Sequence, residues 1–309
     1  MKRYCILLFL LVFLLTGCIT VIPVQPTGST ETGATDTTES TVGSTQSAGW
    51  QTEAAQTFYI NEDGSRHTGW LELNGTRYYL DENGILQTGW LELDGQTYYL
   101  KNDGSIAKGK TTVDSKVYYF TATGAKVILA NPWNMIPSDY KPDLTVVENG
   151  YQVDSACRDS LVQMLADCRK AGHDVRIISA YRKHTTQIEL YNKKVWYYID
   201  RGYNEEDARK EAATIIAIPG TSEHELGLAL DLVDAGYQSL DEAQENTAAQ
   251  KWLMEHCWEY GFILRYPNGK SASTGIIYEP WHYRYVGNAL AKELQTSGLC
   301  LEEYFNTLH

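Results

Sequence analysis

A twenty-residue period in the N-terminal half of the chain constrains its fold more than any other feature. Gly-Trp pairs begin at positions 49, 69 and 89, and Gly109-Lys110 follows at the same interval. Pairs of adjacent aromatic residues keep the same phase, beginning at positions 58, 78, 98 and 118. Asn-Gly and Asp-Gly dipeptides separate the short strand-like runs and favour tight hairpin turns. Each unit is therefore predicted to be one β-hairpin, and stacked hairpins form a solenoid that buries aromatic rings between neighbours.

The periodic segment, residues 49–128, resembles the cell-wall-binding repeats of choline-binding proteins, clostridial toxins and glucan-binding enzymes. In choline-binding versions a Trp precedes the aromatic pair and helps to form a cation–π box. Other residues stand at that place in this chain: Thr57, Arg77, Thr97 and Val117. The resemblance implies a wall polymer, a glycan or a teichoic acid, and leaves open whether choline is a ligand. The rings expected to contact the polymer are Trp50, Trp70 and Trp90.

The N-terminus has the organisation of a secretion signal. A basic pair at positions 2 and 3 precedes an apolar run over 6–15, which is shorter than the roughly 20 residues of a membrane span. The segment Leu15-Thr16-Gly17-Cys18 resembles the lipobox of bacterial lipoproteins. This resemblance implies a signal peptide over 1–17 and a lipid on Cys18 that anchors the chain to the outer face of the bacterial plasma membrane.

The composition of residues 18–48 predicts a flexible tether. Thirteen Ser and Thr residues lie between positions 19 and 48, with no aromatic and no basic residue. Such a segment cannot bury enough apolar surface to offset the entropy of ordering it. The whole chain carries 39 acidic and 26 basic residues, a net charge of −13, which argues against nucleic acid as a partner.

The remaining cysteines do not predict a metal site. Cys157 and Cys168 lie in one helical pattern, about three turns apart, so they cannot bridge each other there. Either could pair with Cys257 or Cys300, or all four could be free. None has the C-x-x-C spacing of a structural zinc site.

Residues 129–309 lack the period and have the length of one domain. Helices are predicted over 155–171, 185–201, 205–216 and 241–260, with a last helix beginning at 289. Strands are predicted over 175–180, 228–233, 262–266 and 283–286. Because helices and strands do not alternate regularly, this pattern favours an α+β fold.

Residues able to bind a metal or to catalyse a reaction concentrate in three segments of this domain, over 220–231, 279–283 and 179–182. His224 lies just before a predicted strand, Asp231 lies within it, and His282 begins another. Two His and one carboxylate, with a fourth position left for water, form a common catalytic zinc arrangement. Glu279, three residues before His282, is placed to act as a general base. Position 228 is Leu, so the chain has no His-Glu-x-x-His helix, and the commonest class of zinc protease is excluded.

The combination of motifs resembles the VanY-like zinc D-alanyl-D-alanine carboxypeptidases. The motif Ser-x-His-x-x-Gly-x-Ala-x-Asp spans 222–231, and Glu-x-Trp-His spans 279–282. Ser-Ala-Tyr-Arg at 179–182, with a Gln five residues later, and the segment 261–267 also match. The resemblance implies an α+β, hedgehog/D,D-peptidase-like zinc domain, in which a small antiparallel sheet is flanked by helices.

The same resemblance assigns expected roles to the residues. His224, Asp231 and His282 would bind one Zn²⁺, and Glu279 would be the general base. Arg182 would stabilise the developing oxyanion or hold substrate. The residues expected to contact the peptide are Ser222, Gln187 and Tyr181.

The resulting prediction is an exported, lipid-anchored carboxypeptidase that removes the C-terminal D-Ala from peptidoglycan stem peptides at the cell wall. Two alternatives stay open on the sequence. One is an L,D-carboxypeptidase of the same fold that acts on tetrapeptide stems, because this preference depends on pocket shape. The other is a wall-binding lipoprotein whose peptidase-like domain is inactive.

Overall fold

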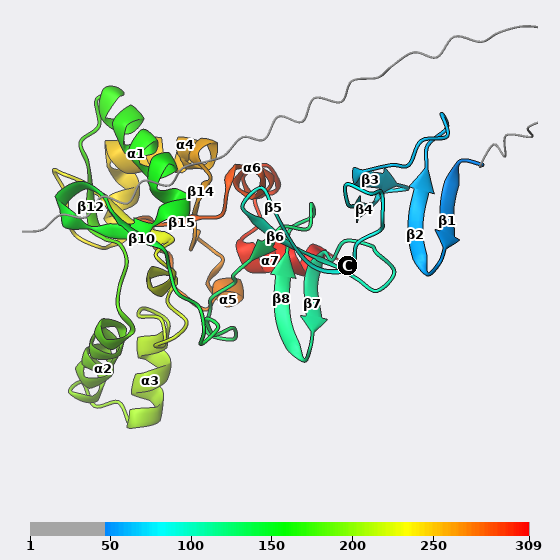
Figure 1. Ribbon diagram of the computed structural model, residues 1–309. Helices are drawn as coiled ribbons and strands as arrows, with labels where there is room; N and C mark the ends of the chain where they lie inside the picture. The colour runs from blue at the N-terminus through cyan, green and yellow to red at the C-terminus, as the bar shows by residue number, and fades with distance from the viewer. Residues whose placement is uncertain (1–46, 309) are drawn as a thin grey trace, which may run out of the picture. The chain divides into compact units, whose positions relative to one another are not determined.

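The computed structural model describes residues 47–308 (Figure 1). The predicted signal peptide, Cys18 and nearly all of the predicted tether lie outside the described residues. Within residues 47–308, no helix has both the length and the apolar character needed to cross a membrane.

Four β-hairpins follow one another in the repeat segment, as the period predicts. Within each hairpin the first Gly pairs with the last residue of the second strand, for example Gly49 with Ile60 and Gly69 with Leu80. The strands are β1 (Gly49–Glu53), β2 (Gln56–Ile60), β3 (Gly69–Leu73), β4 (Thr76–Leu80), β5 (Gly89–Leu93), β6 (Gln96–Leu100), β7 (Gly109–Val113) and β8 (Lys116–Phe120), with β9 (Lys126–Val127) added beside β8.

Aromatic rings connect each hairpin to the next. The centroid of the Trp50 ring lies 5.3 Å from Tyr59 of the same hairpin and 5.0 Å from Tyr78 of the following hairpin. Trp70 and Trp90 make the equivalent pairs. Such edge-to-face contacts stabilise aromatic pairs beyond the area that they bury. The predicted solenoid with aromatic rings between its units is therefore confirmed.

A four-stranded antiparallel sheet organises the C-terminal part. Its order is β12-β13-β15-β14. The strands are β12 (Val175–Ser179), β13 (Ala229–Asp234), β15 (His282–Tyr285) and β14 (Phe262–Leu264). Since side chains alternate between the faces of a strand, Leu230 and Tyr283 enter the main apolar core while Asp231 and His282 lie on the opposite face. The core face packs against α1 (Ser155–Lys170) and α4 (Ala248–His256) (Figure 1). The α+β prediction is confirmed.

The other elements surround this sheet. Helices α2 (His184–Ile199) and α3 (Glu205–Ala213) lie side by side (Figure 1). They share a small apolar cluster of their own. A third cluster joins Tyr119 of the last repeat to α6 (Asn288–Ser297) and α7 (Leu301–Thr307). The remaining short elements are β10 (Leu144–Val146), β11 (Gln152–Asp154) and α5 (Ser271–Thr274).

Two helix predictions are wrong. The segment 241–260 is not one helix: a 3₁₀ turn (Glu242–Asn246), α4 and a second 3₁₀ turn (Cys257–Tyr260) follow one another. The break has a local cause. Thr247 has an extended backbone, and its side-chain oxygen accepts a hydrogen bond from the backbone N–H of Gln250, which makes Thr247 the N-cap of α4. The helix that begins near 289 is also not the last one, since α7 follows it.

The four cysteines of the described residues are all free and buried. Burial raises the pKa of the Cys157 and Cys257 thiols to about 12. Thiols of this kind carry almost no thiolate at neutral pH, so they are structural and unreactive.

Candidate metal centre

Strand pairing brings two of the predicted ligands together. Asp231 on β13 lies directly opposite His282 on β15, so both side chains leave the sheet on one face. His224 comes from a 3₁₀ turn, Glu223–Leu226, just before β13. Gly227 ends this turn with φ +72°, and a Cβ at this residue would lie 2.9 Å from the backbone N of Asp154. The His-x-x-Gly spacing therefore reflects a turn that only glycine closes.

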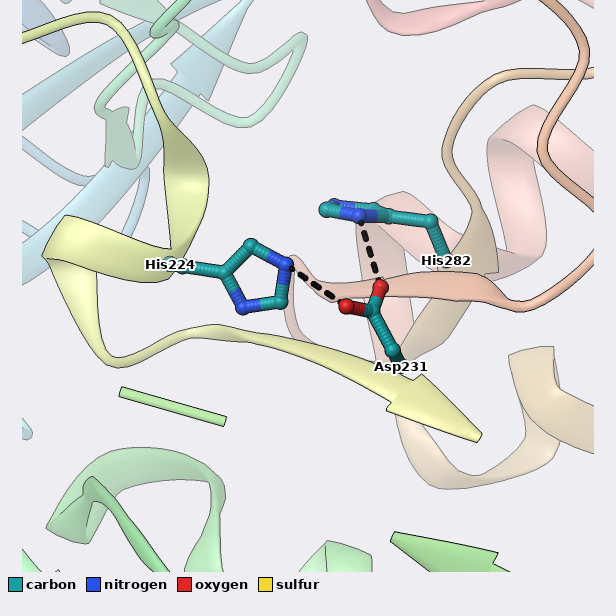
Figure 2. Close-up of side chains that lie close together, drawn as sticks. All are labelled: His224, Asp231 and His282. Carbon is teal, nitrogen blue, oxygen red and sulfur yellow. Dashed lines mark ion pairs between the residues drawn. The ribbon is translucent and has the colours of Figure 1, made fainter. Parts of the chain in front are cut away.

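The three side chains point toward one another (Figure 2). Nε2 of His224 lies 3.3 Å from Oδ2 of Asp231, and Nδ1 of His282 lies 3.3 Å from Oδ1. One ligand atom from each residue lies within 4.8 Å of the others, and all three residues are buried. The ring nitrogens thus approach the carboxylate from two sides.

The donor set fits a zinc ion. Nδ1 of His224 lies 2.8 Å from the carbonyl oxygen of Ala180, and donation to it leaves the Nε2 lone pair facing Asp231. Oδ1 of Asp231 has no hydrogen-bond partner among residues 47–308. Burial favours protonation of Asp231, yet His224 and His282 hold the pKa of this carboxyl well below its usual range. A buried anion with a free oxygen beside two imidazoles is suited to hold a cation, and nitrogen and oxygen donors suit zinc.

The surroundings of the site shift the pKa values of His282 and Glu279. Burial opposes a charge on His282, but the neighbouring carboxylates of Asp231 and Glu223 outweigh it and raise the pKa of His282 to about 9. Burial raises the pKa of Glu279 to about 8. Its Oε2 lies 3.6 Å from Nδ1 of His282, which places this carboxyl beside the ligand set.

Arg182 is held beside the metal centre by polar contacts. One terminal nitrogen donates to Oε1 of Gln187 at 2.9 Å, and the other donates to Oγ of Ser179 at 2.8 Å and lies 3.8 Å from Asp231. Burial lowers the pKa of the guanidinium from its ordinary value. Arg182 thus presents a fixed positive charge beside the ligands.

Two of the residues predicted to contact the peptide do not line the cavity beside the ligands. Gln187 is fully buried, binds Arg182 and donates to the carbonyl oxygen of Ala217 at 2.6 Å. It therefore positions Arg182 and does not line the cavity. Tyr181 does not line it either. Ser222 lines the cavity.

The cavity has a volume of about 210 Å³. Its polar end carries Arg182, Ser222, Glu279 and the three ligands, together with Tyr266 and Trp281. Its other wall is apolar and consists of Ile215, Ile216, Ala217, Leu240, Ile276 and Ile277. The sequence motifs do not include this wall, although two pairs of adjacent Ile residues, 215–216 and 276–277, lie close to them.

The candidate rings of the repeats differ in their surroundings. Trp50 and Trp90 are 39% and 43% exposed, whereas Trp70 is only partly exposed. The guanidinium of Arg77 lies 4.2 Å from the Trp70 ring centroid, so the chain places its own cation there. Nζ of Lys126 lies 5.4 Å from the Trp90 ring centroid, which is farther than Arg77 lies from the Trp70 ring. Trp50 and Trp90 are therefore the more accessible rings.

Comparisons with known proteins match two parts of the chain to family models. Residues 150–288 match the family model of the VanY D-alanyl-D-alanine carboxypeptidases. Residues 68–86 match a putative cell wall binding repeat, and residues 87–130 match a choline-binding repeat.

Relatives and solved structures cover the C-terminal part. A D-alanyl-D-alanine carboxypeptidase of Enterococcus faecalis is 40% identical over 181 residues, which are 59% of this chain and 66% of that protein, just under two thirds. A point mutant of the vancomycin resistance D,D-pentapeptidase VanY, solved in complex with Zn(II), is 40% identical over 58% of this chain and 98% of its own, with a TM-score of 0.53. The LdcB LD-carboxypeptidase is 31% identical over 64% of this chain and 94% of its own, with a TM-score of 0.52.

The matched region contains the strands and turns that position His224, Asp231 and His282. The chain belongs to the VanY family of zinc-dependent D-alanyl-D-alanine carboxypeptidases, and cell-wall-binding repeats precede its family domain.

Proposed function

We propose that this protein removes the C-terminal D-Ala from peptidoglycan stem peptides at the cell wall. The observation that supports it best is the convergence of His224, Asp231 and His282 in a small cavity that also holds Glu279 and Arg182. The proposed division is a wall-binding part over 49–128 and a catalytic part over 129–309. An inactive peptidase-like domain is disfavoured, because a complete ligand set and a neighbouring carboxyl are assembled.

His224, Asp231 and His282 would hold the zinc, which when bound supplies the Lewis acidity that makes water nucleophilic near neutral pH. Glu279 accepts a proton from the attacking water as the water oxygen bonds to the last peptide carbonyl carbon. Glu279 then returns this proton to the amine of the departing D-Ala as the C–N bond breaks. Arg182 donates hydrogen bonds to the oxygen on which negative charge develops.

The dimensions of the cavity favour action on a chain end. Pockets for drug-sized ligands measure roughly 300–1,000 Å³, and this cavity is smaller, at about 210 Å³. It therefore suits a terminal residue of a peptide more than an internal stretch of a polymer. The apolar wall that includes Ile215 and Ile276 suits the methyl group of alanine.

The repeats would hold the enzyme close to its polymeric substrate. Trp50 and Trp90 present exposed rings to which a wall glycan or a teichoic acid could bind. The lipobox-like segment that ends at Cys18 supports a second attachment, a lipid in the outer face of the plasma membrane. Two attachments raise the effective concentration of enzyme at its substrate.

The experiment incubates the zinc-loaded full chain with a pentapeptide stem that ends in D-Ala-D-Ala and, separately, with the tetrapeptide stem. D-Ala release from the pentapeptide that stops on chelation supports the proposal. Release from the tetrapeptide alone would move the assignment to an L,D-carboxypeptidase, the activity named for LdcB. Release from neither, with zinc bound, would contradict both activities.

A further inference from the structure

A buried carboxylate, Glu223, lies directly behind the ligand His282. Its side chain is fully buried. Oε1 accepts hydrogen bonds from Nε of Arg265 and from a terminal nitrogen of Arg284, each at 2.8 Å. Oε2 faces Nε2 of His282 at 3.8 Å. Neither of these two facing atoms has a hydrogen-bond partner among residues 47–308.

The charges around Glu223 balance without a further cation. Arg265 and Arg284 contribute two positive charges, and Glu223 and Glu302 contribute two negative charges. Glu302, on α7, binds the guanidinium of Arg265 through both of its oxygens. Burying four charges is costly unless each is paired. Here every charge is paired, and the pairing fixes Glu223 through one oxygen while the other oxygen stays free toward His282.

The two histidines of the centre present different nitrogens to the ligand site. His224 directs Nδ1 to the carbonyl of Ala180 and Nε2 to Asp231. His282 directs Nδ1 to Asp231 and Nε2 to Glu223. Each ring thus has an oxygen acceptor behind it, and the acceptor decides which nitrogen carries the proton.

We propose that Glu223 is the positioning residue of His282. Its Oε2 accepts the Nε2 proton, which leaves the Nδ1 lone pair for the zinc and fixes the plane of the ring. The role rests on the zinc site described above and adds a residue to it. Removing the carboxylate partner of a ligating His typically lowers metal affinity by about 10- to 100-fold.

The first test compares Glu223→Gln with Glu302→Gln in the full chain. Both residues are buried and both bind Arg265, but only Glu223 faces a ligand. Zinc affinity is measured by competition with a coloured chelator, and the fold of each metal-free variant is checked by circular dichroism. The proposal expects a loss of about 10- to 100-fold for Glu223→Gln and less than about threefold for Glu302→Gln. Equal losses, or no loss in either variant, would overturn it.

A second measurement needs no variant and covers the case in which Glu223→Gln does not fold. In the zinc-loaded protein with ¹⁵N-labelled histidine, one zinc-bound ring should be protonated at Nδ1 and the other at Nε2. Two rings both protonated at Nδ1 would overturn the proposal. If zinc binding follows these expectations and no D-Ala is released, the proposed reaction fails while the role of Glu223 stands.

Discussion

The repeats are held together by contacts between residues close in sequence, whereas the metal centre is formed by residues that lie far apart along the chain. Trp50 reaches its partners at Tyr59 and Tyr78, within the same or the next hairpin. The centre joins Ala180 to His224, 44 positions apart, and pairs Asp231 with His282 across two strands. Repeated local units share a function, so one change has a graded effect. The metal centre occurs once, among residues distant in sequence, so one substitution can abolish its function.

The largest effect is expected from Glu279→Gln. The amide cannot accept the proton from water, and a general base typically contributes about 10²–10⁴ in rate. We therefore expect release of D-Ala to fall by about this factor while bound zinc stays at one per chain. Stoichiometry is measured by metal analysis, and Glu206→Gln on exposed α3 is the matched control. Wild-type turnover in Glu279→Gln would refute the assigned base.

Removal of zinc should separate the two regions of the molecule. A ligand present at a thousand times its Kd stabilises the folded state by about 4 kcal/mol. Chelation should therefore lower amide-exchange protection in β13 and β15 by up to about 1,000-fold. The hairpins β1–β2 and β3–β4 hold no part of the metal centre and should keep their protection. An equal loss in both regions would show that they unfold as one unit.

A third effect, of intermediate size, tests whether Gln187 acts through Arg182. Gln187→Ala removes one acceptor from Arg182, and a hydrogen bond to a charged group contributes about 1.5–3 kcal/mol. We expect kcat/KM to fall by at least about tenfold with zinc affinity unchanged. Gln187→Glu keeps an acceptor for the guanidinium and should restore part of the rate. If Gln187→Glu is as slow as Gln187→Ala, then packing or the lost bond to Ala217, and not the bond to Arg182, explains the loss.

The same difference in range explains what the sequence could predict. The hairpins could be predicted because the strands, the turn and the pairing partner of each repeat all lie within twenty residues. The ligands of the metal centre could be predicted only from motifs whose spacing reflects local geometry. One example is the turn between His224 and β13, which Gly227 ends. Strand pairing then brings Asp231 opposite His282, which no local pattern states.

The sequence did not predict features that depend on distant packing. Gln187 matched a family motif, yet its position behind Arg182 follows from the packing of α2 against the chain at Ala217. Glu223 stands at the position that the motif Ser-x-His leaves unspecified, and its partners Arg265 and Arg284 come from later segments. The break at Thr247 was missed, although Thr is a capping residue and residues 241–247 hold only one apolar residue, Ala243.

The smallest effect is expected in the repeats, where the rings of one type have unequal surroundings. Trp50→Ala and Trp90→Ala should each weaken sedimentation of the full chain with Gram-positive cell walls by about 2- to 30-fold, the range of a cation–π contact of about 0.5–2 kcal/mol. Trp70→Ala should have less effect, because Arg77 already lies over that ring. Trp196→Ala, at an exposed ring on α2, is the control and should leave sedimentation unchanged. An equal loss in the control would place wall binding outside the repeats, and a larger loss for Trp70 than for Trp50 would show that the wall polymer displaces Arg77.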